Sequence, residues 1–128
     1  MSYLTRDELI GRFGETEIVR LERNIAKTDG ANPPTSEQAI SDAVEMVNGY
    51  IAVQYPLPLP VTTEPVKRAV AVVARYYLYK DKPTEIVRLD YEDVIGWLKQ
   101  IAAGKAVLIF PVADDQPERL VGTGIFVV

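Results

Sequence analysis

Residues 63–79, TEPVKRAVAVVARYYLY, decide the fold. Thr63 is a typical helix N-cap, and Pro65 is tolerated in the first turn, so the stretch predicts a helix that begins here. From residue 66 to residue 79 the apolar side chains lie on almost every side of that helix. This pattern is typical of a helix surrounded by protein, and we therefore expect it at the centre of a helical bundle.

Further helices are expected on both sides of this one. Thr5, Thr35 and Thr84 have the positions of N-caps, and a Glu or Gln follows the first two after three residues, as in a capping box. Apolar residues with helical spacing follow each cap. The expected helices cover residues 5–14, 15–23, 35–54 and 84–103, with a loop at 24–35 and an extended proline-containing segment at 55–60.

The composition changes after Gly104. Residues 106–112 and 120–128 have the β-branched and aromatic content of short strands, and the DDQPE turn at 114–118 separates them. The sequence thus predicts an all-α fold, a compact bundle of four to five helices over residues 1–105. Residues 106–128 are expected to form an extended or β-hairpin-like C-terminal tail.

The composition narrows the possible chemistry. The 128 residues include no cysteine and no histidine, which excludes thiolate chemistry and removes the commonest general base and metal ligand. The net charge of −4 argues against a general nucleic-acid binder. Residues 66–79 are too short and too charged to span a bilayer, and the charged N-terminus is unlike a signal peptide, so we expect a soluble intracellular protein. No cofactor and no metal are predicted.

Two charged clusters are candidates for a site. The acids Asp90, Glu92 and Asp93 are favourable near a helix N-terminus, and we prefer that interpretation to a cation site because no partner motif accompanies them. Lys67, Arg68 and Arg75 form a basic stripe on the central helix. The stripe either faces phosphates or pairs with the acidic third and fifth helices, expected at 35–54 and 84–103, within or between subunits, and we favour pairing.

Tyrosines are concentrated in and around the central helix. Three of them within four helical positions point in different directions, and one small subunit is not expected to bury them all. We therefore predict an oligomer. The candidate subunit-interface residues are Tyr50, Tyr55, Pro56, Pro58, Tyr76 and Tyr79.

An ordered set of motifs runs through most of the chain: GYIAVQYPLPL at 49–59, ARYYLY at 74–79, YED at 91–93 and WLKQIAAGK at 97–105. Over roughly residues 3–105 this set resembles the Mu-like prophage family of small virion proteins, which is similar to phage head–tail connectors. The family has no catalytic residues to carry over, so the resemblance implies a protein that is not an enzyme.

The resemblance implies a ring, generally of twelve copies, below the portal at the virion neck, with assembly in the bacterial cytoplasm. The ring extends the DNA channel, so its expected partners are itself, the portal protein, a tail-side neck or tail-completion protein and, non-specifically, the DNA in the channel. No membrane contact is expected. The alternative from another class is a small helical regulator or inhibitor of one partner protein.

A partner-docking role is expected for the apolar end of the chain. We predict that it joins a neighbouring protein such as the portal by strand addition or by filling an apolar groove. The candidate residues are Leu120, Ile125, Phe126, Val127 and Val128.

Overall fold

The computed structural model describes residues 3–29 and 35–110. Five helices make up the regular structure of these residues, and no strand occurs among them, so the predicted all-α class is confirmed. The helices are α1 (Arg6–Phe13), α2 (Glu15–Asp29), α3 (Thr35–Ile51), α4 (Glu64–Leu78) and α5 (Glu85–Ala102).

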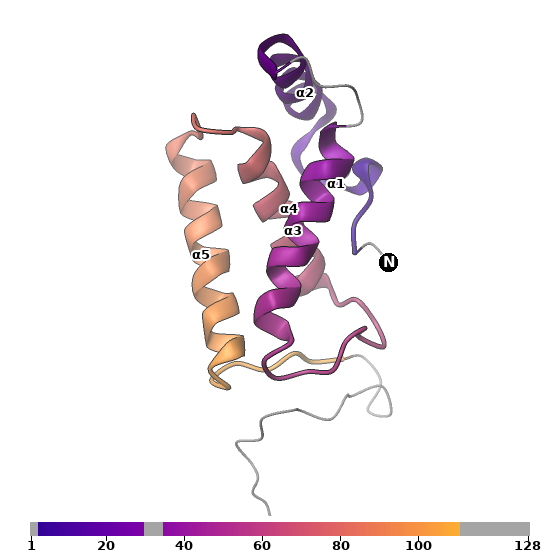
Figure 1. Cartoon of the computed structure of the whole chain (residues 1–128), viewed down its shortest axis with the longest axis vertical. Helices are drawn as coiled ribbons and strands as arrows, with labels where there is room; N and C mark the ends of the chain where they lie inside the picture. Colours follow the sequence, from indigo (N-terminus) through magenta and orange to yellow (C-terminus); the bar gives the residue numbers. More distant parts are fainter. Residues whose placement is uncertain (1–2, 30–34, 111–128) are drawn as a thin grey trace, which may run out of the picture.

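Helix α4 occupies the centre of the bundle, as its sequence predicts. It packs against α3, α5 and α2, and its residues 69–74 are six consecutive buried positions. α3, α4 and α5 contact one another pairwise, and α1 packs on α2 and α3. Figure 1 shows α2 at one end of these long helices, whereas the α3–α4 connection and residues 103–110 lie at the opposite end.

The predicted helix starts agree with the structure to within one residue in all four cases, and the predicted side-chain caps are confirmed in two of them. Thr5 and Glu8 form the expected capping box, and the Thr84 hydroxyl accepts a hydrogen bond from the Val87 amide. Thr63 takes the N-cap position of α4 without a side-chain cap, and its buried hydroxyl has no hydrogen-bond partner in the described residues. Thr35 lies inside α3 as its first residue.

Helix α2 is longer than the sequence predicts. It continues to Asp29, because the buried side chains of Ile18 and Leu21 are followed, at helical spacing, by that of Ile25. Packing of this stripe against α3 and α4 outweighs the low helix propensity of Asn24, which led us to expect a loop from that position.

The predicted strand at 106–112 is wrong for its described part. Residues 107–110 have no regular secondary structure, yet Leu108 and Phe110 are buried in the core of the same subunit. The Leu108 amide donates a hydrogen bond to the Tyr55 hydroxyl over 2.9 Å, in place of a strand partner. The predicted second strand at 120–128, and with it the predicted hairpin, lies outside the described residues.

Candidate functional site

The guanidinium of Arg75 on α4 contacts three other helices of the described residues. Its Nε lies 2.9 Å from Glu17 Oε2 on α2, and one of its terminal nitrogens lies 3.6 Å from Asp90 Oδ2 on α5. The same group stacks on the ring of Phe13 at 4.4 Å from the centroid. One side chain thus joins all the helices except α3.

Tyr79 completes this network. Its hydroxyl donates a hydrogen bond of 2.7 Å to Glu17 and accepts one of 3.4 Å from Arg20. Burial disfavours ionisation of the Glu17 carboxyl, but the hydrogen bonds from Arg75 and Tyr79 outweigh burial and lower its pKa. Burial, followed by the hydrogen bond to Glu17, raises the pKa of Tyr79. Glu17 is therefore held as a carboxylate and Tyr79 as a neutral phenol.

A second carboxylate on α2 ties the N-terminal segment to α3. Arg6 donates two hydrogen bonds, of 2.9 and 2.8 Å, to the two oxygens of Glu22, and the Ser36 hydroxyl donates another. The hydrogen bonds from Arg6 lower the pKa of Glu22 against the opposing effect of burial. Both internal acids of α2 are therefore structural.

The stability of the fold should depend on pH through Glu17 and Glu22. A carboxyl with a lowered pKa in the folded state stabilises the protein above its unfolded pKa, and this contribution is lost as the pH falls through the folded pKa. We expect the free energy of unfolding, measured by urea titration, to fall steadily below about pH 5. The variant Glu17→Gln/Glu22→Gln should be less stable at pH 7 and should lose less stability on acidification; an unchanged acid dependence would contradict this assignment.

The predicted basic stripe does not form one free surface. Arg75 is internal, and Lys67 Nζ lies 3.7 Å from Glu8 and 3.9 Å from Glu64. Arg68 is exposed and makes no ion pair with the described residues. The structure therefore separates three cations that the sequence places together, and it pairs two of them within the subunit.

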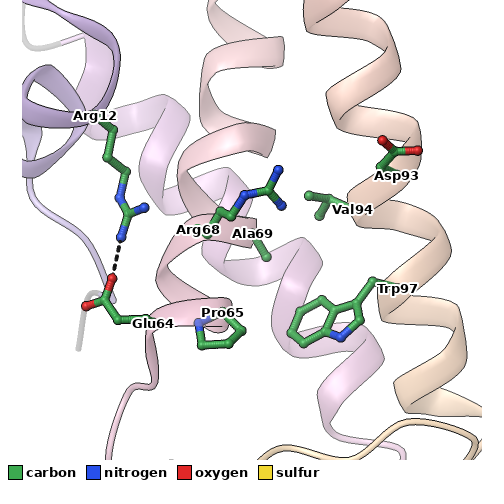
Figure 2. A pocket seen from close by; sticks show the side chains of 8 residues that line it. All are labelled: Arg12, Glu64, Pro65, Arg68, Ala69, Asp93, Val94 and Trp97. Carbon is green, nitrogen blue, oxygen red and sulfur yellow. Dashed lines mark hydrogen bonds and ion pairs between the residues drawn. The ribbon is translucent and has the colours of Figure 1, made fainter.

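Arg68 borders a groove of about 500 Å³ between α4 and α5. Figure 2 shows its side chain directed toward Val94 and Asp93 of α5, with the Trp97 ring facing Pro65. An ion pair of 2.9 Å between Arg12 and Glu64 bounds the groove on the α1 side. The groove is lined by apolar side chains and a few charged ones. Its lining residues include neither a nucleophile paired with a base nor a set of metal ligands.

The candidate interface tyrosines differ in how far they are buried by contacts within their own subunit. Tyr55 is 2% exposed, Tyr76 stacks on Tyr91 at 3.9 Å between centroids and an interplanar angle of 10°, and Tyr50 is half-buried against the core. Pro56 and Pro58 are exposed in the α3–α4 connection, where the peptide before Pro58 is cis. Contact with another subunit stays a prediction for all of these residues, as does the role of the tail residues, which lie outside the described part of the chain.

The three acids that the sequence places together on α5, like the bases on α4, have separate surroundings in the structure. Asp90 lies near Arg75, Glu92 pairs with Arg88 at 2.8 Å, and Asp93 borders the groove. No group of three potential metal ligands occurs in residues 3–29 and 35–110. Within the same ranges, no helix has the length and apolar character that crossing a membrane requires.

Comparison with known proteins assigns the family. Residues 3–124 match the family model described as bacteriophage Mu, Gp36. The chain belongs to the bacteriophage Mu Gp36 family. The match extends beyond residue 105, so it also covers most of the C-terminal tail that the motif set leaves out.

Two relatives in the Gp36 family come from a phage and from a prophage. The chain is 35% identical to gene product J of Escherichia phage Mu over 105 residues, which cover 82% of this chain and 74% of the relative. It is 28% identical to the Mu-like prophage FluMu protein gp36 of Haemophilus influenzae over 116 residues, which cover 91% and 82% of the two chains. The predicted relationship to Mu-like phage proteins is confirmed.

Sequence reasoning missed the Glu17–Arg75 pair of this Gp36-family chain, although both residues carry a usable signal. Phe13 and Leu21, four residues before and after Glu17, are apolar, and Arg75 follows six consecutive small apolar residues on α4. Charges embedded in apolar faces need partners. Which acid would meet which base depends on helix packing, and the sequence spacing does not fix it.

Proposed function

We propose that this chain is a structural head–tail connector subunit of a Mu-like phage, acting at the virion neck. Copies of it form a ring below the portal, extend the DNA channel and join head to tail. The single observation that carries this proposal is membership of the bacteriophage Mu Gp36 family over residues 3–124, taken with the connector-like motif set. A ring of about twelve copies is the expected assembly.

The fold supports a structural role. The polar groups with the strongest interactions, Glu17, Arg75 and Glu22, hold helices together within the subunit. A rigid subunit with several inter-helix ties suits repeated assembly with one geometry. We propose no enzymatic activity, because the described groove carries no nucleophile–base pair and the sequence has neither histidine nor cysteine.

Three external partners follow from this function: the portal protein, a tail-side neck or tail-completion protein, and DNA that passes through the channel. We propose that the apolar stretch 120–128 docks on the portal. Leu108, ten residues or more before this stretch, lies next to Tyr55, at the end of the bundle that also carries the α3–α4 connection.

Removal of the gene from the phage that encodes it tests the function. We expect DNA-filled heads and complete tails that do not join, and we expect added wild-type protein to restore infectious particles in the extract. A phage that lacks the gene but still produces joined particles would contradict the connector role. A block before any head is filled would favour the regulator instead.

A further inference from the structure

Beyond its first residue, the exposed acid Glu15, helix α2 carries acids and bases on different faces. The acids Glu17 and Glu22 point inward to Arg75 and Arg6. The bases Arg20, Arg23 and Lys27 are all exposed, and their spacing of three and four residues aligns them on one side of the helix. This basic stripe of α2 (Arg20, Arg23 and Lys27) belongs to a chain with a net charge of −4, so it is a local concentration of positive charge.

The bases of this stripe are weakly engaged inside the subunit. Arg20 makes one long hydrogen bond, 3.4 Å, to the Tyr79 hydroxyl and lies 6.0 Å from the centre of the same ring. No ion pair joins Arg23 or Lys27 to an acid in the described residues. Arg6 and Arg75, by contrast, both have a carboxylate within 3 Å. The basic stripe of α2 is therefore available to a partner.

The opposite charge occurs on α3. This helix contains three acids and no base, and its acids Glu37, Asp42 and Glu45 are all exposed. Asp42 accepts a hydrogen bond from Gln38 of the same helix, and within the described ranges none of the three acids forms an ion pair. We call these residues the acidic face of α3.

We infer that the basic stripe of α2 binds the acidic face of α3 in a second copy of the chain. The inference rests on the proposed ring, because a closed ring needs two different complementary faces on every subunit. At a rise of about 1.5 Å per residue the stripe is about 10 Å long and the acidic face about 12 Å. The two surfaces are therefore similar in length and opposite in charge.

A second copy fits the stripe better than DNA does. Three cations on one face supply few phosphate contacts, and the acidic balance of the whole chain repels a polyanion. The acidic face of α3 is similar in size to the stripe and opposite in charge. Without this contact, both surfaces would carry unpaired charge on the assembled ring. Complementary patches of this kind fix the register of an interface and steer its association.

Charge reversal on the two faces tests the inference. One variant is Arg23→Glu/Lys27→Glu and the other is Asp42→Lys/Glu45→Lys; all four positions are exposed, so the fold should be unaffected. Assembly of the full chain, alone and on its cognate portal, is measured by native mass spectrometry at low and high salt. Each variant alone should lose at least about tenfold in assembly, because like charges then face each other.

The decisive experiment mixes the two charge-reversal variants and measures whether assembly is restored. In an alternating ring every interface again joins opposite charges, so the equimolar mixture should recover assembly to near the wild-type level, and so should a chain that carries all four changes. The control Lys99→Glu/Lys105→Glu makes the same change in net charge as the α2 variant, at exposed positions away from both faces, and should assemble normally.

The outcomes separate the inference from the proposed function. If wild type and both variants assemble equally well, this interface is wrong while the connector role stands. If the α2 variant fails to assemble and the mixture does not restore assembly, the inference is also overturned. If the wild-type chain binds DNA in a salt-sensitive way and the α2 variant does not, the stripe is a DNA-binding surface. A wild-type chain that neither self-associates nor joins the portal refutes both the function and the interface.

Discussion

Replacement of Arg75 with methionine is expected to lower the free energy of unfolding by about 2–4 kcal/mol. The side chains of Arg75 and Glu17 are only 15% and 19% exposed, so the substitution leaves a largely buried carboxylate without its cation. Methionine keeps the apolar stem of the side chain but loses the stacking on Phe13. Urea denaturation at pH 7 measures the change.

Arg68→Met is the matched control for this prediction. Arg68 lies two turns earlier on α4, is exposed and makes no ion pair within the described residues, so its replacement should change stability by no more than about 0.5 kcal/mol. The double variant Glu17→Leu/Arg75→Met should recover part of the loss, because it also removes the carboxylate that Arg75→Met alone leaves unpaired. Equal effects of Arg75→Met and Arg68→Met would contradict the internal role of Arg75.

Truncation of Leu98 to alanine is expected to cost about 2–5 kcal/mol of unfolding free energy. Leu98 is 0% exposed on α5 and belongs to the core that α4 shares with its neighbours. The loss combines the missing transfer energy of the side chain with the cavity it leaves. The same urea titration measures it, with coincident fluorescence and circular dichroism transitions as the check of two-state unfolding.

Leu89→Ala on the same helix serves as its control. Leu89 is 44% exposed, so the same chemical change should cost no more than about 0.5 kcal/mol. If the two leucine variants lost similar amounts of stability, the orientation of α5 in the bundle would be wrong.

The sequence was sufficient for the centre of the fold because its signals are local and strong. The apolar run of α4 surrounds the helix, and burial of residues 69–74 follows directly from it. Thr5 and Thr84 carry their caps within three residues of themselves, so those helix starts were predictable as well. Thr35 was misplaced as a cap, because a residue of this type is also tolerated inside a first turn.

Features that depend on distant residues were beyond the sequence. The extension of α2 to Asp29 is stabilised by packing of Ile25. Leu108 is buried in the core, and its amide donates a hydrogen bond to the hydroxyl of Tyr55, 53 positions earlier. The same limit affected the candidate site. Lys67, Arg68 and Arg75 share one helix, but Glu8 and Glu17, which pair with Lys67 and Arg75, lie on α1 and α2. Arg68 pairs with no acid of the described residues.

The basic surface of the fold therefore lies elsewhere than the spacing on α4 predicted. On α2, bases and acids are mixed along the sequence, and only helix packing shows which of them face inward. Because Glu17 and Glu22 face inward, Arg20, Arg23 and Lys27 are left outward. The distribution of charge between the inner and outer faces matters more for assembly than the total charge does.

Native mass spectrometry of the purified chain with its cognate portal tests the connector role most directly. We predict that portal particles gain a fixed number of copies, equal to a closed ring, and that a chain ending at residue 118 stays folded but no longer joins them. A wild-type chain that stays a monomer or dimer and ignores the portal would contradict the account, and it would favour a partner-binding regulator with the fold of this family.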